Sequence, residues 1–398
     1  MRFAIAVVTL ATATAKFADP PAVGQDISPA SPPLGLYVRD GVLMREGKPY
    51  LGVGANYFSL FSRILQDPND TSSLANLVAL RRAGVPFVRF MGCGFWPADN
   101  RLYLADREEF FRRLDRVVLT AEASRIGLIP SLFWHTATVP DMMNESLDQL
   151  GVDESRSIEF IRHYTEDVVQ RYRTSPAIWA WEFGNEYNLG CDLPNGHLHR
   201  PPIVPRLGTA DKRTERDELK IEQLQVAFDA FARSVRKWDA RRAILTGNSI
   251  PRESAYHNRQ EGTWTSDTRE QFAEILRRDN PDPFDTITVH TYYRPQGGYP
   301  GPSDTIDGML AACAAEAARA KKPLFVGEFG ASRELGDKER AVFNAFLDGI
   351  VRYHIPLAAF WVFDFGPQDK DYNITLNNGR AYMIRRIGEV NRTLSALK

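Results

Sequence analysis

The chain has 398 residues, of which 43% are hydrophobic and 25% are charged, so it can bury one large core. Its formal net charge is −1, so no overall positive field draws it to nucleic acid or to an acidic membrane. We therefore expect one main folded domain and a neutral ligand.

The N-terminus has the pattern of a secretory signal. A basic residue at Arg2 precedes a short apolar stretch, and the run ends in Ala13-Thr14-Ala15, which fits cleavage after small residues. A plain disordered leader is the alternative. No segment reaches the ~18 uninterrupted apolar residues that a membrane span needs. The sequence therefore predicts a signal peptide over residues 1–15 and a secreted or periplasmic protein.

Folding is predicted to begin after a flexible lead-in. Residues 16–34 are rich in Pro, Ala, Ser and Gly without periodicity. Two short apolar runs, 36–39 and 42–45, then flank Asp40-Gly41, a pair that suits a two-residue hairpin turn. We expect this hairpin to cap the bottom of a domain that spans residues 35–398.

From there strand and helix patterns alternate eight times, which predicts parallel strands with crossover helices. The predicted strands are 50–57, 85–91, 128–135, 177–186, 243–248, 285–292, 323–329 and 357–364. The predicted helices are 74–83, 107–125, 155–172, 215–238, 269–278, 305–320, 338–353 and 381–397. The pattern indicates an α/β fold, a (β/α)8 TIM barrel, with its reactive groups at the carboxyl ends of the strands. A doubly wound open sheet is disfavoured because no glycine-rich phosphate motif follows the first strand.

Several connections on the predicted catalytic face are long. They cover 188–213, 251–267, 293–303 and 366–378, and they carry Pro, Gly and aromatic residues suited to the walls of a cleft.

Polar side chains stand at the ends of these strands, where a packed core would not hold them. Two apolar runs end in carboxylates, Glu186 after Asn185 and Glu328 before Phe329-Gly330. The other polar or aromatic positions of this kind are Arg89, His135, His290, Tyr292 and Trp361. Two carboxyl groups at one site are what cleavage of a glycosidic bond requires.

The motifs W-E-F-G-N-E at 181–186 and V-G-E-F-G at 326–330 resemble those of glycoside hydrolase family 5, the cellulase and mannanase family. The resemblance covers nearly the whole chain. It implies that Glu328 is the nucleophile and Glu186 the acid/base of a retaining reaction, with Arg89, His135, Asn185, His290, Tyr292 and Trp361 binding the substrate. Under it, Arg89 is expected to lower the pKa of Glu328, while burial and the charge of Glu328 raise that of Glu186.

Two neighbours of the acid/base need a structural explanation. Strict alternation along a strand would point Asn185 and Glu186 to opposite faces, so the strand must twist or bulge at its end. Glu182 has the parity of Glu186 but lies deeper, and we interpret it as a buried partner for a cation such as Arg89.

Aromatic residues provide candidate sugar platforms. Trp361 is the expected platform at the cleavage site, with a core tryptophan as the alternative. Trp96, Trp134 and Trp264 lie in or near the upper loops, where further sugar subsites and simple packing are equally reasonable.

The three cysteines, Cys93, Cys191 and Cys313, do not form a disulfide framework. Cys93 and Cys191 follow strands on the same face, which leaves both a pair and two free thiols open. His197 and His199 lie near Cys191, but their spacing matches no tetrahedral metal site, and we expect neither metal nor cofactor.

The sequence thus predicts a secreted, monomeric, retaining β-glycoside hydrolase that acts on a β-1,4-linked polysaccharide or oligosaccharide. Residues 45–57, 175–182 and 322–330 look closer to the β-mannanases of the family than to its cellulases, although Tyr187 stands where that branch usually has Pro. A cellulase or β-glucanase, a transglycosylase and a catalytically silent sugar-binding barrel are the alternatives.

Overall fold

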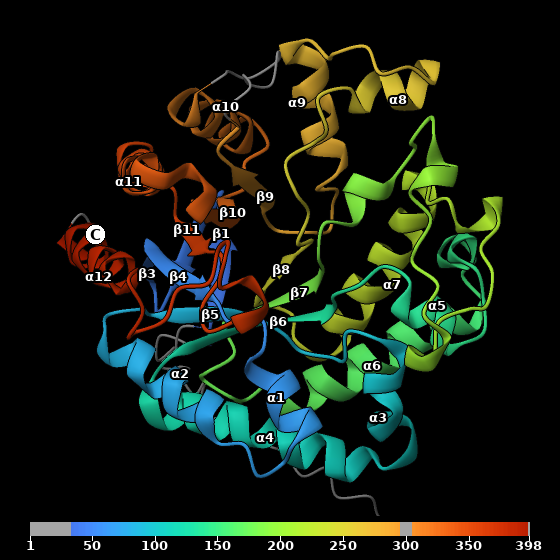
Figure 1. The fold of residues 1–398 in the computed structure, drawn as a ribbon, viewed down its shortest axis with the longest axis horizontal. Helices are drawn as coiled ribbons and strands as arrows, with labels where there is room; N and C mark the ends of the chain where they lie inside the picture. Colours follow the sequence, from blue (N-terminus) through green and yellow to red (C-terminus); the bar gives the residue numbers. More distant parts are fainter. Residues whose placement is uncertain (1–32, 295–304, 397–398) are drawn as a thin grey trace, which may run out of the picture. The chain divides into compact units, whose positions relative to one another are not determined.

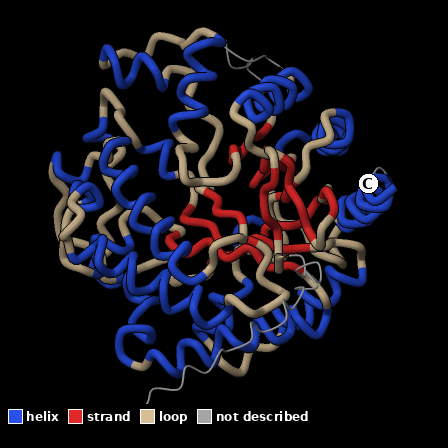
Figure 2. The backbone as a smooth tube through the Cα atoms, turned by 180° about the vertical axis from the view of Figure 1, so that it is seen from behind, coloured by secondary structure: helices blue, strands red, loops and turns tan. Residues whose placement is uncertain are grey.

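Eight parallel strands form the centre of the computed structural model, which describes residues 33–294 and 305–396. Helices surround the strands on the outside (Figures 1 and 2). In sheet order the strands are β8 Ala243–Leu245, β7 Ala180–Gly184, β6 Gly127–Phe133, β5 Phe87–Met91, β4 Gly52–Asn56, β11 Leu357–Phe360, β10 Leu324–Gly330 and β9 Ile287–Tyr292. The predicted α/β barrel is confirmed.

The two ends of this sheet meet to close the barrel almost completely. Asp285 N donates to Ile244 O at 3.0 Å, and Ile244 N donates to Asp285 Oδ2 at 2.7 Å. Ile250 N donates to His290 O at 3.2 Å further along. A carboxylate side chain thus supplies part of the closure between β8 and β9.

The strands are buried on both faces, as parallel strands covered by helices must be. Every residue of β5 and of β6 is buried. Close packing here depends on a glycine, because a Cβ on Gly127 would lie 2.2 Å from the ring of Trp179.

Eight helices match those predicted, with boundaries shifted by one or two residues at most ends. They are α2 Ser72–Arg82, α4 Arg107–Ser124, α6 Arg156–Tyr172, α7 Ile221–Trp238, α9 Arg269–Arg278, α10 Ile306–Arg319, α11 Glu339–Arg352 and α12 Ala381–Ala396. Side-chain N-caps fix several starts: Asp106, Ser155, Thr268 and Thr305 each accept a backbone N–H of the first turn.

The helix predicted over 215–238 is wrong at its start. Residues Glu215–Asp217 form a separate 3₁₀ turn, in which Asp217 accepts Thr214 N at 2.8 Å, and Glu218 is extended. The α-helix therefore begins at Ile221.

Short helices in the connections between the strands and the longer helices were not predicted. They are α1 Leu60–Gln66, α3 Arg101–Ala105, α5 Thr138–Met142 and α8 Ala255–Glu261. Helices of one or two turns carry too little periodicity to be recognised in a sequence.

The predicted hairpin is present and covers the end of the barrel where the strands begin. β1 Leu36–Arg39 pairs with β2 Val42–Arg45, and a short β3 Lys48–Pro49 joins them. Leu36 and Leu43 belong to one apolar cluster with Phe87, Phe325 and Leu357. Both turn residues, Asp40 and Gly41, have positive φ, as the expected tight turn requires.

The three cysteines are buried free thiols, so Cys93 and Cys191 do not form a pair. The predicted signal peptide, 1–15, and residues 16–32 of the lead-in lie outside the described residues. Among the helices that the structure describes, none is both long and apolar enough to cross a membrane.

Candidate active site

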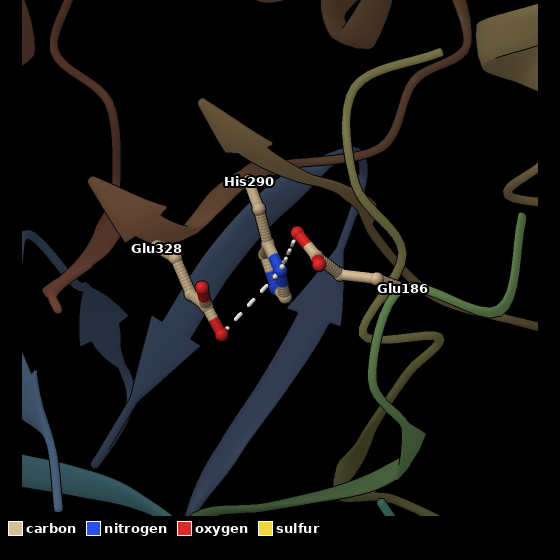
Figure 3. A group of neighbouring side chains, drawn as sticks. All are labelled: Glu186, His290 and Glu328. Atoms are coloured by element: carbon tan, nitrogen blue, oxygen red, sulfur yellow. Dashed lines mark hydrogen bonds and ion pairs between the residues drawn. The ribbon is translucent and has the colours of Figure 1, made fainter. Parts of the chain in front are cut away.

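The two glutamates come from different parts of the barrel and face one another (Figure 3). Glu328 lies within β10, and Glu186 follows β7 by two residues. Glu186 has φ 55° and ψ 28°, a left-handed conformation outside the strand. Strand alternation therefore ends before this residue, which removes the expected conflict with Asn185.

A β-bulge at Gly327 directs Glu328. Val326 pairs with Val289 and Glu328 pairs with His290, so Gly327 is an extra residue in β10. Asn56 Nδ2 donates to Gly327 O at 2.8 Å, which holds the bulge. A Cβ at Gly327 would lie 2.7 Å from His290 Nε2, so this position needs glycine.

Arg89 is fully buried and connects the polar groups of the site. Its Nε donates to Glu182 Oε1 at 2.7 Å, and its Nη1 donates to Glu328 Oε1 at 2.8 Å. Its remaining N–H groups reach Asn56 Oδ1 and Asn185 Oδ1, each at 2.9 Å. The predicted ion pair between Arg89 and Glu182 is confirmed, and one guanidinium serves two carboxylates.

Residues of β9 complete the contacts of both glutamates. Tyr292 OH donates to Glu328 Oε2 at 2.6 Å, so both oxygens of this carboxylate are held. His290 Nδ1 lies 3.1 Å from Glu186 Oε1 and 3.5 Å from Glu328 Oε1 (Figure 3). His290 therefore lies between the two carboxylates.

This arrangement shifts the pKa values of the two carboxyl groups in opposite directions. Burial raises the pKa of Glu328, the charge of Glu186 adds to the rise, and the positive charges of His290 and Arg89 oppose it. Burial acts likewise on Glu186, but the hydrogen bond and charge of His290, with Ser249 and Arg89, lower its pKa overall. Both directions are the reverse of those expected: burial outweighs Arg89 and His290 at Glu328, and the contact with His290, which the sequence could not show, lowers the pKa of Glu186.

An open cavity of about 780 Å³ lies over the two glutamates. Its predicted lining residues are Trp96, Trp134, Asn185, Glu186, Tyr292, Glu328 and Trp361. The rings of Trp134 and Trp361 stack at 6.1 Å with 27° between their planes, and Trp361 Nε1 donates to Gln368 Oε1 at 2.8 Å. These contacts fix the orientation of the expected sugar platform.

Four predicted residues are not among those that line this cavity: Arg89 and His290, which contact the glutamates beneath it, and His135 and Trp264. His135 packs its ring against Phe95 and Trp96, at 4.9 and 5.5 Å between centroids, and its Nδ1 lies 3.3 Å from Thr138 Oγ1. Trp264 is half exposed in the segment between α8 and α9. His135 thus packs against two aromatic residues of the cavity lining.

Some cavity residues were missed by the sequence analysis. They are Phe58, Ser59, Ser62, Arg63, Gln66, Met91, Phe95, Asp99, Asp364, Phe365, Gly366, Pro367 and Gln368. Asp364 ends a predicted strand in the same way as Glu186, so the same reasoning could have found it. Arg63 and its neighbours lie on the unpredicted helix α1, which gave no signal.

Glu186, His290 and Glu328 each offer one possible metal ligand, and these three atoms lie within 4.8 Å of one another. The guanidinium of Arg89 lies 2.8 Å from Glu328, which disfavours a cation there. The arrangement suits two carboxyl groups acting directly on a substrate.

Comparison with known protein families matches residues 67–364 to the family described as Cellulase (glycosyl hydrolase family 5). The chain belongs to glycosyl hydrolase family 5. As a member of that family it is a glycoside hydrolase, and its substrate is a carbohydrate. No curated protein sequence matches the chain.

Solved structures with the same fold include several enzymes of this kind. An endo-1,4-β-mannanase from Rhizomucor miehei has a TM-score of 0.64 at 17% identity, with 91% of this chain and 99% of that chain covered. An exo-β-1,4-mannosidase from Opitutaceae bacterium strain TAV5 has 0.59 at 17%, covering 90% and 62%. Cellulase Cel5C_n has 0.53 at 18%, covering 91% and 92%. At these identities the likeness establishes the family 5 fold alone.

Proposed function

We propose that the protein is a retaining β-glycoside hydrolase that cleaves β-1,4-linked polysaccharide or oligosaccharide, with β-mannan as the preferred substrate. The observation that carries this proposal is the fixed pair of carboxylates at the base of an aromatic-lined cavity. Both oxygens of Glu328 are held by Arg89 and Tyr292, and Glu186 faces it across His290.

The spacing of the glutamates supports retention of the anomeric configuration. One oxygen of Glu186 and one of Glu328 lie within 4.8 Å. Retaining enzymes place their carboxyl groups roughly 5–5.5 Å apart, whereas inverting enzymes leave about 6.5–9.5 Å for a water molecule. An oxygen–oxygen distance within 4.8 Å fits the shorter, retaining spacing.

In the first step, Glu328 attacks the anomeric carbon and forms an ester while the glycosidic C–O bond breaks. Glu186 gives its proton to the departing oxygen. In the second step, water attacks the same carbon, its proton passes to Glu186, and the ester bond to Glu328 breaks. Asn185, held by Arg89 at 2.9 Å, is positioned to contact the sugar's 2-hydroxyl.

The reaction needs Glu328 ionised and Glu186 protonated, whereas the surroundings raise the pKa of Glu328 and lower that of Glu186. The 3.1 Å contact between His290 and Glu186 supplies a route, since one proton can pass from imidazole to carboxylate. A bound sugar excludes water and favours that neutral pair. In that neutral pair the charges of Glu186 and His290, which shift the pKa of Glu328 in opposite directions, are both absent, and Arg89 and Tyr292 still lower it.

The preference for mannan rests on the three stretches that resemble β-mannanases and on the mannanase among the structural relatives. Tyr187, the departure from that branch, is 2% exposed and packs on Phe183 at 5.1 Å. It is not among the residues that line the cavity, so its identity does not alter the lining directly. The family description and a cellulase relative favour β-glucan as the second candidate.

Kinetics and NMR test this proposal together. We expect kcat/KM to be higher on mannohexaose than on cellohexaose, and the first product seen by NMR to be the β anomer. A preference for cellohexaose would indicate that the substrate is a β-glucan. An α product would exclude the retaining mechanism. No turnover on any β-linked substrate or aryl β-glycoside would indicate that the protein is a catalytically silent sugar-binding barrel. A product mixture dominated by longer oligosaccharides would identify a transglycosylase.

Export from the cytoplasm is part of the proposal, supported by the basic and apolar pattern of residues 1–15. Expression of the full chain with its native N-terminus, followed by N-terminal sequencing of the exported protein, should show cleavage after Ala15. Retention of an intact Met1 in the cytoplasm would contradict it.

A further inference from the structure

The cavity extends mainly to one side of the two glutamates. Apart from Asn185, Glu186, Tyr292 and Glu328, its lining residues are Met91 at the end of β5 and residues of the connections after β4, β5, β6 and β11. In the strand order, β4 and β11 lie across the barrel from β7, the strand that precedes Glu186. The larger part of the cavity therefore lies away from the acid/base.

Given the proposed function, this asymmetry indicates which end of the substrate occupies the larger part of the cavity. Glu186 protonates the leaving group, so that group lies on the β7 side of the scissile bond. The sugar attacked by Glu328 rests at Trp361, and any sugar unit before it extends toward α1 and the 3₁₀ turn Gly366–Gln368. The cavity thus offers most of its surface to the non-reducing side of the substrate.

Asp364 lines this part of the cavity, and its carboxylate is held by three hydrogen bonds. Its Oδ2 accepts from Arg63 Nη1 at 2.7 Å, Asn76 Nδ2 at 2.8 Å and Tyr57 OH at 3.0 Å. Its main-chain O accepts from Ser59 Oγ at 3.1 Å. The side chain is 18% exposed, and Oδ1 accepts no hydrogen bond from the residues that the structure describes.

The surroundings of Asp364 combine a fixed acceptor with apolar surface. The rings of Phe58 and Phe365 lie 4.9 Å apart, and Phe58 also lies 6.1 Å from Trp361. Both phenylalanines line the cavity beside Asp364. Aromatic faces next to a preorganised hydrogen-bond acceptor are what recognition of a sugar ring requires.

We propose that Asp364 is a specificity-determining residue. Its Oδ1 accepts a hydrogen bond from a hydroxyl group of the sugar unit that precedes the one at Trp361. This inference rests on the proposed function and adds a substrate preference to it: the enzyme favours substrates with at least two sugar units on the non-reducing side of the cleaved bond. Three donors fix Oδ2, so Oδ1 needs little reordering to bind.

The test compares an aryl β-monoglycoside with the corresponding aryl β-1,4-diglycoside, in the mannose series or in whichever series the wild-type enzyme cleaves. The readout is the ratio of kcat/KM for the diglycoside to that for the monoglycoside. Asp364→Asn should lower this ratio about 10- to 100-fold, the effect of one hydrogen bond to a charged group. Asn tolerates the φ of 50° at this position and is close in size.

A matched control is Asp115→Asn. Asp115 also accepts from an arginine and a tyrosine, Arg171 Nε and Tyr172 OH, each at 2.8 Å, but it lies on α4 outside the cavity. This variant should keep the wild-type ratio. Asp364→Glu, which keeps the charge but moves it by one methylene group, should also lower the ratio.

An unchanged ratio in a folded Asp364→Asn protein would overturn the inference, as would equal losses on both substrates. Thermal unfolding of each variant identifies a folding defect, and Asp364→Glu then decides the question. A wild-type enzyme that cleaves the monoglycoside but gains nothing from the second sugar would also overturn it, while leaving the proposed function intact. A wild-type enzyme that cleaves neither substrate would refute the proposed function itself.

Discussion

Arg89 and Glu182 form an ion pair in which neither side chain is exposed, with 2.7 Å between Nε and Oε1. Glu182 is not a reagent, since it lies beneath the site and contacts the guanidinium. Its role is to fix the guanidinium so that Nη1 donates to Glu328 and Nη2 donates to Asn185. Glu182 is therefore a positioning residue.

Replacing Glu182 by Ala should lower the free energy of unfolding by about 3–5 kcal/mol, because one partner of a buried pair is lost. Asp115→Asn, in the half-exposed pair with Arg171, should cost about 1 kcal/mol or less. Urea unfolding followed by fluorescence measures both. Equal losses in the two variants would mean that burial adds nothing to the pair of Arg89 and Glu182.

The glutamates should respond differently to added nucleophiles, because only Glu328 forms the covalent bond. Glu328→Gln should abolish turnover on every substrate. Glu186→Ala should still form the glycosyl ester from substrates with good leaving groups, and azide should restore turnover as a β-glycosyl azide. An α-glycosyl azide from the Glu328 variant, with no rescue of the Glu186 variant, would reverse the roles.

His290→Asn should shift the pH profile of kcat/KM to higher pH. The positive charge of His290 lowers the pKa of Glu186 and opposes the rise in that of Glu328. Removing this charge raises both pKa values, so both limbs of the bell-shaped profile move upward. The control is His163→Asn, an exposed histidine on α6. A profile that stays in place would contradict this effect of His290 on the two glutamates.

His135 should make stability depend on pH. Burial lowers its pKa from 6.5 to about 4, so the unfolded chain binds a proton that the folded protein does not. The stability from neutral His135 is complete above pH 6.5 and is lost as pH falls toward 4, a loss of about 3 kcal/mol.

His135→Gln should therefore flatten the decline in unfolding free energy between pH 7 and 4, measured by urea unfolding at each pH. His163→Gln, at an exposed position, should leave the wild-type slope. A wild-type slope in the His135 variant would mean that this imidazole is protonated in the folded protein.

The sequence was sufficient to predict the barrel, because buried parallel strands and amphipathic helices leave separate patterns. It also placed Glu186 and Glu328 at one mouth, since polar residues at the ends of apolar strands stand out. The left-handed backbone of Glu186 and the bulge at Gly327 left no local signal, because they arise from contacts with distant residues such as Asn56 and His290.

The parts of the site that depend on tertiary packing were least predictable. The pKa of Glu328 is raised because it is buried, and that of Glu186 is lowered because His290 lies 3.1 Å away, and both depend on three-dimensional packing. Arg63 was missed because α1 has only 7 residues, too few for its periodicity to be recognised. His135 was expected in the cavity, but the rings of Phe95 and Trp96 pack against it and it is not among the lining residues.

The closure between β8 and β9 bears on how this protein tolerates variation over evolutionary time. Neighbouring strands elsewhere in the sheet order are joined by backbone ladders, which persist whatever side chains the gene encodes. Between β8 and β9 the amide of Ile244 instead depends on the carboxylate of Asp285, which Arg236 Nη2 also contacts at 2.6 Å. One side chain thus contributes to the closure of the barrel, and a substitution of Asp285 would weaken the junction between β8 and β9 without changing either glutamate.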